Sequence, residues 1–120
     1  MTSSSAQKLD GTRVLIVENS WHLAEALRMT VEQAGGTVAG IAATLVDANR
    51  LLAGPPFQAA VVDFSLRDGK STPLIKQLVG NGVKVVVVSG HDLPDEIRSV
   101  ARACLEKPAS PDDIVAALAG

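Results

Sequence analysis

Two patterns of hydrophobic and polar residues take turns along the chain. Short runs rich in valine and isoleucine alternate with segments in which apolar residues recur every three or four positions. The run at 59–62 is apolar throughout and that at 83–88 is apolar except for Lys84, which is typical of central parallel strands buried on both faces. A further run at 13–17 and weaker runs at 37–42 and 103–106 complete a prediction of five strands, the weaker two as flanking or edge strands.

The segments between these runs predict five helices. Leu23, Leu27 and Val31 recur every four residues in the first helix, and Gly35-Gly36 ends it. Serine and threonine cap helix starts by accepting backbone N–H bonds, and proline is favoured in the first turn. On these signals the other helices begin at Thr44, at Ser71 or Thr72 with Pro73, at Pro94-Asp95-Glu96 and at Ser110-Pro111.

The alternation of strands and helices predicts an α/β fold of the (βα)₅ type. Helical crossovers of this length require parallel strand pairing, and right-handed crossovers place helices on both faces of one sheet. Ligands of such sheets bind beyond the carboxyl ends of the strands. The residues that follow each strand are therefore the candidates for function.

Composition narrows the class of protein. The chain has 120 residues, 47% of them hydrophobic, which predicts one packed domain over 12–120 after a flexible, polar, Ser-rich tail at 1–11. A formal charge of −2 argues against non-specific nucleic-acid binding. The single cysteine, Cys104, indicates a reducing compartment, and the longest aliphatic run, 85–88, is too short to span a membrane. We expect a cytoplasmic protein without nucleic-acid or membrane partners.

Polar residues follow four of the predicted strands. Glu18 and Asn19 come after the first, Asp63 after the third, Ser89 after the fourth and Lys107 after the fifth. Because parallel strands bring these residues to one edge, two carboxylates meet there, and their repulsion requires a cation or a raised pKa. Mg²⁺ prefers such oxygen ligands, and a lysine and a hydroxyl suit a bound phosphate. The combination points to phosphoryl transfer onto a carboxylate.

Structural interpretations of the same residues stay open. Glu18 and Asn19 can cap the following helix, Ser89 can form a turn with the next glycine, and Lys107 can be a surface lysine. The pair Asp68-Gly69 reads as a turn, and Ser71 or Thr72 as a helix cap. Cys104 reads as an inert buried thiol.

Four short motifs carry a resemblance to a known family. They are Val-Leu-Ile-Val-Glu-Asn at 14–19, Val-Val-Asp-Phe-Ser-Leu at 61–66, Val-Val-Val-Val-Ser-Gly at 85–90 and Leu-Glu-Lys-Pro at 105–108. The four motifs occur in the order typical of the family, and each lies at the end of a predicted strand. The chain from about Thr12 to Ala119 therefore resembles a two-component response-regulator receiver domain. The resemblance implies a flavodoxin-like doubly wound (βα)₅ fold with a five-stranded parallel sheet in the order 2-1-3-4-5.

The resemblance also implies roles for individual residues. Asp63 would be the phosphoacceptor, and Mg²⁺ or Mn²⁺ would be held by Glu18, Asn19, Asp63 and the backbone carbonyl of Ser65. Lys107 would contact the phosphate, before a proline where the family often has a cis bond. Ser89 would supply the switch hydroxyl of the family.

The chain departs from the family pattern at two positions. Asn19 stands where a second acid is usual, which removes one negative charge, so we expect Mg²⁺ binding to be weakened about tenfold. Cys104 stands where the family usually has Tyr or Phe, so the aromatic switch is missing. The segment from Ser89 to Lys107 is short for the family, which implies a trimmed fourth helix and a monomer or weak homodimer.

The function implied is that of a single-domain response regulator. It would accept a phosphoryl group on Asp63 from a sensor histidine kinase or a histidine phosphotransfer protein. Output would come through contact with a downstream protein target, as a relay, a phosphate sink or a phosphorylation-dependent binder, and no external metabolite would be turned over. The alternative is a phosphorylation-independent pseudo-receiver, in which Asn19 and Cys104 mark the lost chemistry. A third possibility is an unrelated flavodoxin-like enzyme, against which the lack of a phosphate-binding loop after the first strand counts.

Overall fold

The protein folds around one parallel sheet. The computed structural model describes residues 8–120. Five strands pair in the order β2-β1-β3-β6-β7, and every neighbouring pair is parallel. This order is the predicted 2-1-3-4-5, so the expected fold class is confirmed. The strands are β1 (Arg13–Val17), β2 (Thr37–Ala42), β3 (Ala59–Asp63), β6 (Lys84–Ser89) and β7 (Ala103–Glu106).

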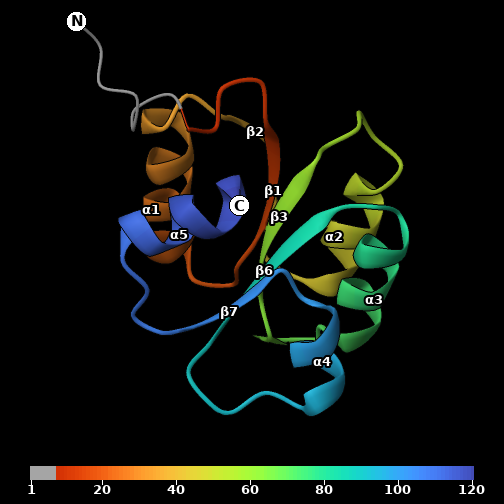
Figure 1. Ribbon diagram of the computed structural model, residues 1–120. Coiled ribbons are helices and arrows are strands. Elements are labelled where there is room, and N and C mark those ends of the chain that lie inside the picture. Colours follow the sequence, from red (N-terminus) through yellow and green to blue (C-terminus); the bar gives the residue numbers. More distant parts are fainter. Residues whose placement is uncertain (1–7) are drawn as a thin grey trace, which may run out of the picture.

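Helices cover both faces of the sheet. Figure 1 shows α1 and α5 together on one side and α2, α3 and α4 on the other. Among the described residues, no helix is long and apolar enough to cross a membrane. The helices are α1 (Trp21–Gln33), α2 (Leu45–Leu51), α3 (Thr72–Gly80), α4 (Asp95–Val100) and α5 (Pro111–Ala119).

Alternate residues of the central strands enter two separate cores. In β6, Val85 and Val87 pack in the core beneath α2, α3 and α4, whereas Val86 and Val88 pack in the core beneath α1 and α5. Because both faces of the strand are buried, neither set of positions can be polar. This explains the continuous valine run from which the strand is predicted.

Predicted capping residues begin two of the helices. The side chain of Thr44 accepts a hydrogen bond from the Asp47 N–H, and that of Ser110 accepts one from the Asp113 N–H. At α1 the cap is Ser20, which accepts from the Leu23 N–H, so neither Glu18 nor Asn19 is the capping residue.

A small hairpin follows β3 that the sequence pattern does not predict. β4 (Ser65–Leu66) and β5 (Gly69–Lys70) pair antiparallel, with Ser65 opposite Lys70. The chain reverses at Arg67 and Asp68, close to the predicted turn, and Gly69 has φ +141°, a conformation that favours glycine. Strands of two residues are too short to show a period in the sequence.

The packed domain begins earlier than the predicted boundary at residue 12. Leu9 is fully buried in the core beneath α1 and α5, and its N–H donates to the Ala34 carbonyl over 2.9 Å. A Cβ placed on Gly36 would lie 3.1 Å from the Leu9 Cβ, so the glycine permits this close approach. One apolar residue in a polar stretch has no period, which is why the pattern assigns it to the tail. Residues 1–7 of the predicted tail lie outside the described part of the chain.

Replacement of Leu9 tests this boundary. Leu9→Ala removes a fully buried side chain, so we expect the free energy of unfolding to fall by about 2–4 kcal/mol. Urea denaturation measures it, with the exposed neighbour Lys8→Ala as the matched control. Equal stability of the two variants would place Leu9 in an unpacked tail.

Candidate functional site

Two buried carboxylates and a lysine meet at the carboxyl edge of the sheet. Glu18 directly follows β1, Asp63 ends β3 and Lys107 directly follows β7. The Lys107 Nζ lies 3.0 Å from Asp63 Oδ2 and 3.4 Å from Glu18 Oε1. Glu18 is 3% exposed and Asp63 6%, so the ammonium group neutralises charge where little water reaches. We call these three residues the carboxylate–lysine cluster.

Backbone N–H groups orient both carboxylates. The Ser20 N–H donates to Glu18 Oε2 over 3.0 Å, and the Ser65 N–H donates to Asp63 Oδ1 over 3.2 Å. Each carboxylate therefore directs one oxygen to the Lys107 ammonium and the other to the backbone. Bonds to the charged form fix which way each group points before any ligand arrives.

The charges of the cluster are not balanced. Burial raises the pKa of Glu18, and the nearby Asp63 charge adds to this, against the hydrogen bond from Ser20 and the attraction of Lys107. Burial alone would lower the pKa of Lys107, but its hydrogen bond to Asp63 and the two carboxylate charges outweigh that effect and raise it. The lysine is thus cationic at neutral pH. With both carboxylates ionised the cluster carries a formal charge of −1, which attracts a further cation.

The oxygen atoms around the cluster suit a hard cation. In the sequence, Asn19, which has an amide oxygen, directly follows Glu18, and Ser65, which has a backbone carbonyl, is two residues after Asp63. Within residues 8–120, no three His, Cys, Asp or Glu side chains are grouped so as to hold a metal ion. Mg²⁺ needs only one or two carboxylates when waters and a phosphate complete its shell, so the donor set fits that ion.

Ser89 lies at the same edge but turns away from Asp63. It is buried at the end of β6, where its hydroxyl donates to the His91 carbonyl over 2.8 Å and accepts from the His91 N–H over 3.1 Å. Its backbone carbonyl accepts from the Lys107 N–H over 2.9 Å. In this structure Ser89 therefore closes the turn that the alternative interpretation predicted, and a role as switch hydroxyl stays a prediction.

Cys104 lies beside this turn. It is partly buried in β7, and with Ser89 and His91 it lines a hollow at this end of the sheet. Burial raises the pKa of the Cys104 thiol, which keeps it in the unreactive protonated form. This agrees with the interpretation of the residue as an inert thiol.

Ser71 contributes to the site although the sequence predicts only a helix cap. Its side chain makes no capping bond; the hydroxyl instead donates to the Asp63 carbonyl over 2.5 Å, and its N–H donates to the Phe64 carbonyl over 2.8 Å. A capping side chain needs an extended backbone, whereas Ser71 has φ −82° and ψ 4°. The same serine–proline signal fits both arrangements, so the sequence cannot distinguish them.

Asp68 is more than the turn residue predicted. Its carboxylate accepts from the N–H groups of Leu45 and Val46, over 2.9 and 3.2 Å, at the start of α2. These bonds, that from Leu45 foremost, lower the pKa of Asp68. The hairpin next to Asp63 is therefore attached to α2, and no local sequence signal pairs residues 23 positions apart.

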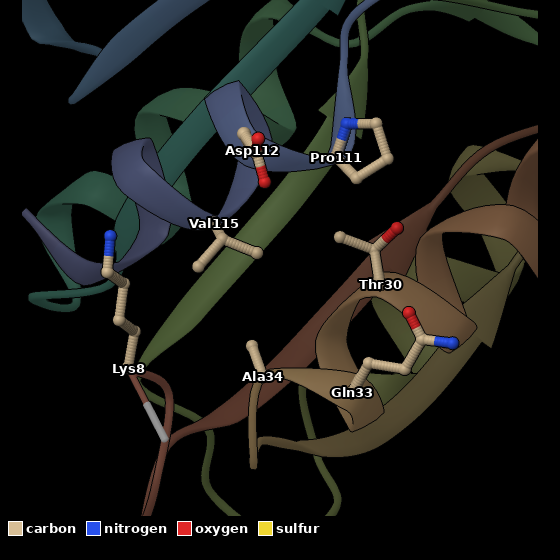
Figure 2. Close-up of a pocket in the computed structure, with 7 residues that line it drawn as sticks. All are labelled: Lys8, Thr30, Gln33, Ala34, Pro111, Asp112 and Val115. Atoms are coloured by element: carbon tan, nitrogen blue, oxygen red, sulfur yellow. The ribbon is translucent and has the colours of Figure 1, made fainter. Parts of the chain in front are cut away.

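Two hollows lie between α1 and α5. One is an apolar groove that reaches the carboxylate–lysine cluster at Glu18 and Lys107. The other, in Figure 2, shares Thr30 and Pro111 with that groove but contains no member of the cluster. Lys8 and Asp112 are its charged residues, and they do not form an ion pair. We therefore place the candidate site at the cluster.

The fold matches solved receiver domains over most of the chain. A CheY-like response regulator receiver domain from Methylobacillus flagellatus superimposes with a TM-score of 0.78 at 28% identity, over 88% of this chain and 92% of that one. A CheY-like receiver domain protein from Methanospirillum hungatei JF-1 gives 0.78 at 25% identity, over 90% and 89%. The chain thus shares its fold, over most of its length, with CheY-like response-regulator receiver domains.

A third match was solved in a modified state. It is a response regulator protein from Burkholderia pseudomallei with a phosphorylated aspartic acid, a calcium ion and citrate; its TM-score is 0.78 at 24% identity, over 89% of this chain and 66% of that one. No protein-family model and no curated protein matches the sequence. The Lys107–Pro108 bond is cis, as the resemblance implied.

The raised pKa of Glu18 makes a prediction for stability. A group whose pKa is higher in the folded state destabilises the fold once it is ionised, so Glu18→Gln should raise the urea midpoint at pH 7 in the absence of divalent cations. The gain should shrink as the pH falls toward 4.5, because the carboxyl of the unfolded wild type then also takes up a proton. Glu25→Gln, at a half-buried ion pair on α1, is the control. A lower midpoint for Glu18→Gln would show that the ion pair with Lys107 outweighs burial.

Proposed function

We propose that this receiver domain accepts a phosphoryl group on Asp63 from the phosphohistidine of a sensor histidine kinase or histidine phosphotransfer protein. The observation that carries the proposal is the Asp63 carboxylate, held at the open end of β3 between the Lys107 ammonium and the Ser65 N–H. A buried carboxylate in that position serves no packing purpose. It is a nucleophile already oriented toward the edge of the sheet.

The transfer step needs little from the protein beyond position and charge. A carboxylate oxygen of Asp63 attacks phosphorus, an O–P bond forms, and the N–P bond of the donor breaks with its electron pair passing to the departing imidazole nitrogen. Lys107 then exchanges its contact with Asp63 Oδ2 for one with a phosphoryl oxygen. Glu18 keeps the other side of the ammonium in place, since it lies 3.4 Å away.

Mg²⁺, or Mn²⁺ in its place, is the cofactor we assign to this site. Glu18, Asn19, Asp63 and the Ser65 carbonyl would hold it, and the formal charge of −1 on the cluster favours its binding. When bound, the cation neutralises charge on the phosphoryl oxygens while the phosphoryl group is transferred from donor to acceptor. The related Burkholderia pseudomallei protein, solved with a phosphorylated aspartic acid and a calcium ion, supports a divalent cation in this class of site.

The output we propose is contact with a downstream protein target. Ser89 is the residue placed to respond, because its carbonyl holds the Lys107 backbone while its hydroxyl holds His91. When the phosphoryl group offers a new acceptor, the hydroxyl leaves His91 and the segment before α4 changes its conformation. Relay of the phosphoryl group, a phosphate sink and phosphorylation-dependent binding are all compatible with this output.

Intact-mass measurement tests the acceptor. Incubation with acetyl phosphate and Mg²⁺ should add a single phosphoryl group of about 80 Da to the wild-type protein. Asp63→Asn and wild type with excess chelator should show no adduct, because the first lacks the nucleophile and the second the cation. A folded wild-type protein that acquires no adduct would overturn the proposal. It would favour the pseudo-receiver, a constitutive protein-binding module.

Restoring the missing acid tests the metal ligands. Asn19→Asp brings the formal charge of the cluster and its neighbour from −1 to −2, so we expect Mg²⁺ to bind about tenfold more tightly. Calorimetric titration of the metal measures this, and Asn49→Asp, an exposed position on α2, controls for net charge. Equal affinities for wild type and Asn19→Asp would remove residue 19 from the metal shell.

A further inference from the structure

A second lysine lies at the rim of the site. Lys70, in β5, stands opposite Ser65 in the hairpin, and its Nζ donates to the Ser65 Oγ over 2.8 Å. The same Nζ lies 5.5 Å from the centre of the Phe64 ring. Phe64 and Ser65 are the two residues that follow Asp63. The Lys70 ammonium is therefore placed on the chain segment that directly continues from the acceptor.

A short series of hydrogen bonds connects Lys70 with the acceptor carboxylate. Lys70 donates to the side chain of Ser65, and the backbone N–H of the same Ser65 donates to Asp63 Oδ1 over 3.2 Å. One residue thus separates the ammonium group from the acceptor oxygen. Lys70 and Asp63 are thus connected through successive contacts of a single residue, Ser65.

The hairpin that carries Lys70 is fixed at both ends. Asp68 accepts from two N–H groups of α2, and Ser71 donates to the Asp63 and Phe64 carbonyls. These bonds hold the backbone of Lys70 in a fixed position with respect to Asp63. Its exposed four-carbon side chain keeps the freedom to turn toward a group that arrives at the site.

Lys70 has no carboxylate of its own to neutralise. Among residues 8–120, the ion pairs include Lys107 twice and Lys76 once, and none includes Lys70. An ammonium group has three N–H donors, and the Ser65 hydroxyl takes only one. Lys107, in contrast, is already engaged by two carboxylates. A positive charge with spare donors at the rim suits an incoming anion.

We propose that Lys70 is a second lysine that contacts the phosphoryl group, binding the anionic oxygens of the phosphodonor and of the phosphorylated site. The proposal rests on Asp63 being the acceptor. A phosphoryl group carries nearly two negative charges, and the single ammonium of Lys107 is shared with Glu18. Lys70 supplies the further positive charge by moving its Nζ from the Ser65 hydroxyl to a phosphoryl oxygen.

Binding of a phosphoryl mimic tests this contact without requiring transfer. We would titrate beryllofluoride with Mg²⁺ into the wild-type chain and three variants by calorimetry. Lys70→Gln should bind about fivefold more weakly, and Lys70→Arg should recover most of the loss, because it keeps a cationic donor. Arg67→Gln removes the same charge from the same hairpin but from a side chain that does not contact Ser65, so its affinity should stay within about twofold of wild type. High salt should reduce the Lys70→Gln effect, and the urea midpoint should not change.

The outcomes separate this proposal from the proposed function. Equal affinity for wild type and Lys70→Gln, an equal loss in Arg67→Gln, or no binding by the wild type would each overturn the role of Lys70. A wild-type protein that binds beryllofluoride but gains no phosphoryl adduct would overturn the transfer function alone, and the Lys70 comparison would still be decided by the affinities.

Discussion

The site depends on one ammonium group placed between two buried carboxylates. Removing Glu18 and Asp63 from water is costly, and Lys107 offsets that cost only because its Nζ reaches both. This requires the ends of β1, β3 and β7 to converge, and parallel pairing in the order β2-β1-β3-β6-β7 brings them together. With both carboxylates ionised, one negative charge is not compensated within the cluster, which favours the binding of a cation, as the proposed function requires.

The strand that separates Asp63 from Lys107 has a role of its own. β6 lies between β3 and β7, and its last residue, Ser89, binds the Lys107 N–H through its carbonyl and His91 through its hydroxyl. The position of the lysine and the conformation of the turn toward α4 are thus set by the same residue. A two-state response would require a second hydrogen-bonding arrangement of Ser89, such as the one proposed above for the phosphorylated site.

Much of this arrangement follows from simple rules applied to the sequence. Continuous valine runs predict strands buried on both faces, crossovers predict parallel pairing, and the residue after each strand predicts Glu18, Asp63, Ser89 and Lys107 at one edge. The rules do not predict the contacts of Leu9, Asp68 and Ser71. Leu9 and Asp68 make contacts with residues distant in the sequence, and Ser71 bonds to the end of β3, eight positions back. None of these contacts has a hydrophobic period to reveal it, and the serine and aspartate fit local interpretations equally well. Such contacts depend on what the fold brings near, not on neighbours in the chain.

These unpredicted contacts explain how the second half of the site is built. A pair of two-residue strands has little stability of its own, so β4 and β5 hold their shape because Asp68 is bonded to α2 and Ser71 to the end of β3. The Ser65 N–H and carbonyl, on one side of Asp63, are consequently positioned by the attachments of the hairpin to α2 and to the end of β3. Glu18 and Lys107, on the other side, are positioned by the sheet. Asp63 lies where these two supports meet: one of its oxygens accepts from the Ser65 N–H and the other from the Lys107 ammonium. A phosphoryl group added there, as proposed, would displace one or both of these contacts.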